Sequence, residues 1–204
     1  MDIFAVVSIA ASLFFIMDPF ASLPMFISVT KGLEDKTVKS YCNRAILVAG
    51  ILLFTFIFIG EPMMDLFGIS MDSFRVAGGL VLIMMGIELI FALKLSSGKG
   101  EEDAPWVIIA TPVLTGPGVI TASILFSTEF GIMAVILAGL ISLIATWLLL
   151  RCAPYIMRAV GEKPLNITSR IIGLLIAGLG VEYIFQGSWN WIVAHDVAAA
   201  MMFF

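Results

Sequence analysis

The sequence predicts an all-α membrane protein with six transmembrane helices arranged as two inverted three-helix repeats. Three observations lead to this fold class: the composition, the spacing of the apolar stretches and an internal repeat. The 204 residues are 61% hydrophobic and 13% charged, with a mean hydropathy of +1.11. A water-soluble fold of this size cannot bury so much apolar surface. The net charge of -4 comes without any basic run, which argues against nucleic acid as a partner.

Three apolar stretches in the first half are long enough to be spans, because about 20 apolar residues cross the hydrocarbon core as a helix. The first, 3–29, has no basic segment in front of it, so we expect it to persist rather than to be cleaved as a signal peptide. The basic segment 31–44 separates it from the second stretch, 45–66. The third stretch is 73–93.

The second half offers three further stretches. The first two are 106–128 and 131–150, and the latter has small side chains at every fourth position, which favours close packing of helices. A polar segment, 151–166, precedes the last stretch, 167–186. Residues 187–204 contain two tryptophans and are expected to form an interfacial C-terminal tail.

The basic residues predict the orientation, because cytoplasmic loops of membrane proteins collect lysine and arginine. Ten of the eleven basic residues follow the first span, follow the third span or lie between the fifth and sixth. Arg75 alone lies on the other side. The sequence therefore predicts a multi-pass protein of the cell (inner) membrane with both termini on the extracytoplasmic side.

An internal repeat relates the two halves. Several markers recur at nearly one displacement: Pro19 and Pro24 as Pro112 and Pro117, residues 86–91 as 180–185, and Arg75 as Arg170. The displacements are 93, 94 and 95 positions. Because each half has an odd number of spans, the second half must enter the membrane from the opposite side, an organisation typical of secondary transporters. We expect a first repeat in residues 1–104, a second, inverted repeat in 105–186 and the tail in 187–204.

The paired prolines predict that helices 1 and 4 are broken near the membrane midplane. Each proline removes an amide donor and clashes with the preceding turn, and lipid tolerates an interrupted helix only where protein or a water-filled cavity satisfies the freed groups. The free helix ends suit a carboxylate at one end and a cation at the other, so a small zwitterion would satisfy both. The candidate substrate-binding residues in the two breaks are Asp18, Pro19, Ser22, Thr111, Thr115, Gly116, Gly118 and Thr121.

Asp18 is the sharpest single candidate, because an ionisable group at mid-membrane is costly unless it is paired or hydrated. Binding a substrate ammonium, binding a coupling cation and taking up a proton all stay open as roles. A structural role stays open as well, since Asp is a good N-cap for a half-helix that begins at Pro19. The serine and threonine candidates have a structural alternative too, which is hydrogen bonding to carbonyls of their own helix.

A second set of polar residues is interpreted as gating or structural charge: Asn43, Arg75, Arg170, Glu88 and Glu182. In each helix the arginine and the glutamate lie 12 or 13 residues apart, which is too far for them to pair. Snorkelling to the membrane interface and gate contacts on opposite faces both stay open for them. Without a HExxH motif, a cysteine and histidine cluster or a Ser/His pair in the spans, the sequence predicts no metal, no cofactor and no enzyme activity.

The combination of these motifs resembles the MarC family of integral membrane proteins, which includes the SnatA small neutral amino acid transporters and is grouped with the LysE-type transporters. The resemblance covers about residues 1–186. The motifs that carry it are the DPxxxxP pattern of residues 18–24, Phe67-Gly68-Ile69-Ser70, Phe74-Arg75-Val76-Ala77-Gly78-Gly79, Thr115-Gly116-Pro117-Gly118 and Arg170-Ile171-Ile172-Gly173.

The resemblance implies a secondary transporter that moves glycine, alanine or similar amino acids by alternating access, with broken helices 1 and 4 forming the site. The expected partners are a small neutral amino acid, H⁺ or Na⁺ as a coupling ion, and the lipid bilayer. Assembly into a homo-oligomer stays open. A passive channel and an accessory membrane subunit are the alternative functions.

Overall fold

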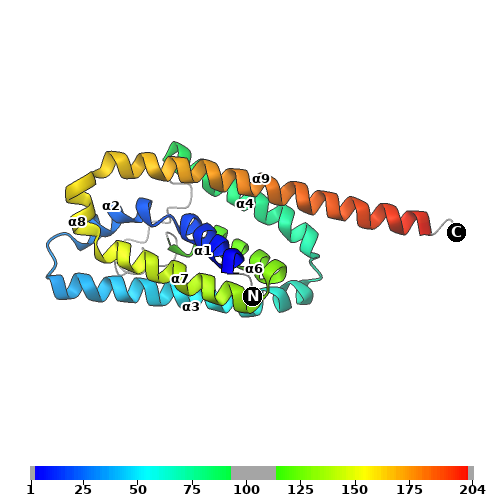
Figure 1. Cartoon of the computed structure of the whole chain (residues 1–204), viewed down its shortest axis with the longest axis horizontal. Coiled ribbons are helices and arrows are strands. Elements are labelled where there is room, and N and C mark those ends of the chain that lie inside the picture. The colour runs from blue at the N-terminus through cyan, green and yellow to red at the C-terminus, as the bar shows by residue number, and fades with distance from the viewer. Residues whose placement is uncertain (1–2, 93–113, 202–204) are drawn as a thin grey trace.

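The computed structural model describes residues 3–92 and 114–201, and this part of the chain consists of helices joined by short turns, without a strand (Figure 1). The predicted all-α class is therefore confirmed. The helices are α1 (Ile3–Met17), α2 (Pro19–Thr30), α3 (Asp35–Phe67), α4 (Met71–Phe91), α6 (Pro117–Phe130), α7 (Ile132–Arg151), α8 (Ala153–Val160) and α9 (Glu162–Met201).

Four helices are long and apolar enough to cross a membrane, namely α3, α4, α7 and α9. The bent pair α1 and α2 raises that number to five when it is counted as one span. Residues 106–113 of the predicted fourth span lie outside the described residues, and α6, with 14 residues, is shorter than a full crossing. The structure thus supports a multi-span membrane protein with four or five of the six predicted spans.

Two helices extend beyond the apolar stretches from which they were predicted. Helix α3 begins ten residues before the predicted span, at Asp35, and ends at Phe67, followed by Gly68, whose φ of 65° suits a glycine cap. Helix α9 does not end at residue 186 but continues through the segment expected as a tail, to Met201. Hydropathy marks only the part of a helix that is apolar, while the helix itself runs on until a cap or breaker ends it.

The helices form layers, with α4 and α9 side by side, α3 and α7 side by side, and α1, α2 and α6 between them (Figure 1). The inward side of α1 supplies the centre of the core through Ile9, Leu13, Ile16 and Met17, which are at most 2% exposed. Large apolar side chains point outward from α3, α4, α7 and α9 instead. In a membrane protein such outward side chains face lipid, so this surface agrees with the membrane assignment.

Candidate functional site

The candidate site is built around a break between two short helices in the core. Helix α1 ends at Met17 and α2 begins at Pro19, and the two axes differ in direction by 42°. Asp18, between them, has a φ of 34° and a ψ of 67°, a left-handed conformation that is uncommon outside glycine but tolerated by Asp. The break that the sequence predicts in helix 1 is therefore present at this residue.

The carboxylate of Asp18 is buried and only partly satisfied. The residue is 3% exposed. Its Oδ1 accepts a hydrogen bond from the Ala21 amide at 3.3 Å and another from the Ser169 hydroxyl at 3.2 Å. Its Oδ2 is buried without a hydrogen-bond partner among the described residues. Because a buried charge is costly unless it is paired, the second oxygen is a ready acceptor for a proton, a cation or an ammonium group.

Asp18 has the structural role that the sequence left open for it. The bond from Ala21 makes it the N-cap of α2, with Pro19 at the first helical position, as predicted. The Ser22 hydroxyl donates to the Asp18 backbone carbonyl at 3.1 Å, which is the bond to its own helix that was the structural alternative to substrate binding. The cap uses only one carboxylate oxygen, and the other remains available for chemistry.

Helix α6 begins at the second proline-containing segment, next to α1. Gly116 is the N-cap of α6 and Pro117 its first residue, so a helix starts at the second of the two prolines for which a break was predicted. A Cβ placed on Gly118 would lie 2.6 Å from the Met85 Sδ and 3.5 Å from a methyl carbon of Ile16. Since Ile16 is two residues before Asp18, the first turn of α6 packs close to the break in helix 1.

The other candidates of this second segment have structural contacts or fall outside the described residues. The Thr115 hydroxyl donates to the Ala49 carbonyl of α3 at 3.3 Å. Thr121 lies one turn into α6, and its methyl group packs against Gly78 of α4. Thr111 belongs to residues 93–113, which lie outside the described residues.

The charged and polar set predicted for gating does not meet at Asp18. Asn43 accepts a hydrogen bond from the Trp147 indole at 2.8 Å. Glu182 accepts one from Gln186 at 2.9 Å. Arg170 is exposed and Glu88 half-buried. In the described part of the chain, none of these residues has a hydrogen bond or ion pair with Asp18.

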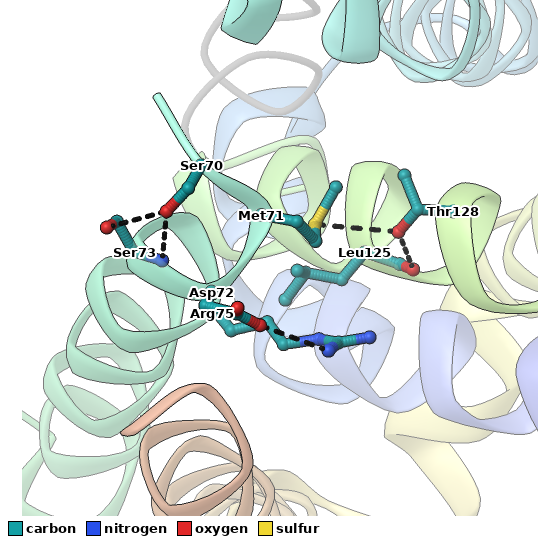
Figure 2. A network of polar contacts seen from close by, with 7 residues as sticks. All are labelled: Ser70, Met71, Asp72, Ser73, Arg75, Leu125 and Thr128. Carbon is teal, nitrogen blue, oxygen red and sulfur yellow. Dashed lines mark hydrogen bonds and ion pairs between the residues drawn. The ribbon is translucent and has the colours of Figure 1, made fainter. Parts of the chain in front are cut away.

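Arg75 lies at the start of α4, in a group of polar contacts shown in Figure 2. Its guanidinium is 3.7 Å from the Asp72 carboxylate, one turn earlier. Ser70 caps the helix by accepting from the Ser73 amide at 3.2 Å. Thr128 of α6 donates to the Met71 sulfur at 3.6 Å, which ties the two helices together here. Arg75 is thus held at a junction of α4 and α6 that is separate from the Asp18 break.

Sequence reasoning missed the residue that holds Asp18 from another helix, Ser169 of α9. Ser169 is 5% exposed and lies 151 positions from Asp18 along the chain. A signal for it exists, since the buried positions of this part of α9 follow helical spacing: Leu165, Ser169, Ile172, Gly173 and Ile176. Reading that stripe in the sequence places the Ser169 hydroxyl on the inward face, where a buried donor needs an acceptor.

Ser142 and Thr146 of α7 are further buried hydroxyls near α1. Ser142 donates to the Ala10 carbonyl at 2.7 Å, and the Thr146 hydroxyl lies 3.9 Å from the Met17 sulfur. The sequence favoured a packing role for the small-residue stripe that contains them, and they do join α7 to α1. Among the described residues, no group of three His, Cys, Asp or Glu side chains is placed to hold a metal ion.

Comparison with known proteins gives one family. Residues 3–192 match the profile described as MarC family integral membrane protein. A UPF0056 membrane protein, YhcE of Escherichia coli K12, is 30% identical over 190 residues, which covers 86% of this chain and 87% of that protein. A UPF0056 membrane protein of Methanocaldococcus jannaschii is 31% identical over 189 residues, covering 87% and 92%. The UPF0056 inner membrane protein YhgN of Escherichia coli K12 is 28% identical, covering 91% and 97%. No solved structure matches.

Proposed function

The chain belongs to the MarC family of integral membrane proteins, and from that premise we propose that it is a secondary transporter of small neutral amino acids, such as glycine or alanine, working by alternating access. The observation that carries the proposal is the Asp18 carboxylate, buried at a helix break with one oxygen that no described residue hydrogen-bonds. The relative YhgN is described as an inner membrane protein. We place this chain in the inner membrane too, with both termini extracytoplasmic.

Two neighbouring groups of opposite polarity suit an amino acid at this break. The unpaired Asp18 Oδ2 is an acceptor for the ammonium group. The N-terminus of α6, which begins at Pro117 close to Ile16, carries the partial positive charge that favours a carboxylate. Gly116 and Gly118, at the start of α6, have no side chains to fill the space between this helix end and the Asp18 carboxylate. We therefore expect substrates with a small side chain, and neither a cofactor nor a metal in the transport step.

The contact between α4 and α9 supports the inverted-repeat part of the proposal. Gly79 lies so close to Gly180 that a Cβ on either would meet the carbonyl oxygen of the other, and the same holds for Gly86 and Gly173. Gly173 comes 94 positions after Gly79, and Gly180 comes 94 after Gly86. The pairing thus maps onto itself when the two halves are exchanged, as a two-fold axis between the helices requires.

Uptake by purified protein in proteoliposomes tests the proposed function. We expect labelled glycine or alanine to enter at a rate that saturates with concentration, and to exchange with unlabelled amino acid inside, because a carrier must reorient once per cycle. Imposed H⁺ and Na⁺ gradients identify the coupling ion. Empty liposomes are the control. A flux that rises linearly without saturation would indicate a channel, and no flux of any amino acid would indicate an accessory subunit.

Ser169→Ala is expected to weaken transport by about tenfold, because it removes a buried hydroxyl that donates to Asp18 and shifts how the carboxylate is held. The measurement is the initial rate of glycine uptake over a range of concentrations. Thr168→Ala is the matched control, since that neighbouring residue is half-buried and its hydroxyl donates, within the described chain, to the Pro164 carbonyl of its own helix rather than to Asp18. Equal rates in the two variants would exclude Ser169 from the site.

A further inference from the structure

A polar groove of about 530 Å³ lies away from the Asp18 break, where α4, α6 and α9 meet. Its lining residues combine both charges, two amides and two aromatic rings: Arg75, Glu129, Phe185, Gln186, Trp189 and Asn190. A second groove of similar volume runs between α4 and α9 nearby, and its lining is mainly apolar. Neither groove includes Asp18.

The two charges of the polar groove do not neutralise one another. Arg75 forms its one ion pair, within the described chain, with Asp72 of its own helix, and the 3.7 Å separation makes that pair a loose one. The Nε of Arg75 is buried and has no hydrogen-bond partner in the part of the chain that the structure describes. Glu129 has no ion pair among the described residues. The Arg75 guanidinium, which has N–H donors to spare, and the Glu129 carboxylate, which has no ion pair in the described chain, therefore line the same polar groove.

We propose that this groove is a second binding site for a free amino acid, at which the solute is captured or released on its way to or from the Asp18 break. The inference rests on the proposed function and adds to it the extracytoplasmic site. The planar fork of Arg75 binds the carboxylate of the solute, for which guanidinium geometry is matched. The Glu129 carboxylate binds the ammonium group, and the amides of Gln186 and Asn190 line the remaining wall.

The charge distribution along the chain agrees with this placement. In the topology inferred from the basic residues, Arg75 is the one basic side chain on the extracytoplasmic side. The groove therefore offers one positive group, Arg75, beside the Glu129 carboxylate, and Asp72 already lies against Arg75, which disfavours anionic amino acids. A solute that carries one positive and one negative group meets a complementary partner for each.

Binding at the groove can be followed through Trp189, which lines it. Trp106, Trp147 and Trp191 are replaced by Phe so that Trp189 is the sole indole, and Asp18→Asn is added to remove the charge at the central break. Glycine and alanine are titrated into this protein in detergent, and we expect a saturable change in Trp189 emission. Arg75→Gln and Glu129→Gln are each expected to weaken the apparent affinity by about tenfold or more, because each leaves one charge of the solute unpaired.

Arg158→Gln is the control, since it makes the same charge change on the exposed surface of α8, outside the groove. Glu129→Gln alters an exposed side chain and should leave folding intact, so it tests the site even if Arg75→Gln lowers the yield. In the otherwise unmodified chain, both groove variants are expected to raise the KM for uptake while Arg158→Gln does not.

The outcomes separate this inference from the proposed function. Glycine uptake by the wild type, with the Trp189 response and the KM unchanged in both groove variants, overturns the groove site and leaves the transporter standing. A saturable Trp189 response in a protein that transports nothing supports the groove and overturns the transporter. A response to phosphatidylethanolamine added to the micelles, with none to glycine or alanine, also overturns the groove, because that headgroup carries the same two charges.

Discussion

Asp18→Asn is expected to lower the rate of glycine or alanine uptake by about a hundredfold, because it removes a buried charge from a polar contact with the solute. The change is nearly isosteric. Asparagine still accepts from the Ala21 amide and from Ser169, still caps α2 and still tolerates the left-handed backbone at this position. Protein yield and melting temperature should therefore stay close to those of the wild type.

Uptake in proteoliposomes measures the expected loss of transport, and thermal unfolding in detergent measures the expected retention of stability. Asp65→Asn is the matched control, because it removes an exposed carboxylate near the end of α3. If Asp18→Asn transports like the wild type at every pH examined, the carboxylate is only a helix cap and the proposed substrate site is wrong. A large loss of melting temperature would instead assign Asp18 to the stability of the break.

Gly180→Val is expected to destabilise the protein by about 3 kcal/mol or more, which is the upper range for overpacking a close contact. A Cβ at this position would lie 2.5 Å from the Gly79 carbonyl oxygen and 2.9 Å from a side-chain carbon of Ile83, so α4 and α9 must separate to admit it. The contact is between backbones, and no flexible side chain can move aside to relieve it. Small residues at such helix crossings are what permits the close approach.

The melting temperature in detergent, together with the yield of monodisperse protein, reports this loss. The same helix provides the matched control, because Gly178 is exposed and a Cβ on it would meet no atom of the described residues within 4 Å. Gly178→Val should therefore unfold close to the wild-type temperature, whereas Gly79→Val should resemble Gly180→Val. Equal stability of the 178 and 180 variants would mean that α4 and α9 do not pack in this register.

The features that the sequence predicted well are those with local causes. The break at Asp18 and the start of α6 at Pro117 follow from proline, which fixes its own backbone and lacks a donor. The N-cap role of Asp18 follows from its place before a proline. These signals lie within a few residues of the structure they cause, so a single sequence is enough to read them.

The features that the sequence did not predict depend on distant parts of the chain. Ser169 reaches Asp18 across 151 positions, and only the packing of α9 on the break brings the two together. Gly86 and Gly180 were visible as repeat-related positions, but their pairing with Gly173 and Gly79, respectively, depends on the register of α4 against α9. Hydropathy did not predict where α9 ends, because a helix can continue past the apolar residues that mark a span.

The length of α9 makes its C-terminal end a sensitive position at which to detect a change in the angle between helices. Its 40 residues form one unbroken rod, about 60 Å long at the rise of an α-helix, and its last turns run well past the ends of the other helices (Figure 1). A rod that pivots where it touches α4 sweeps its free tip through a much wider arc than anything near the pivot. If one half rocks against the other, as the proposed alternating access requires, a small tilt at the paired glycines becomes a larger displacement at the end of α9, so a probe attached there would report it most sensitively.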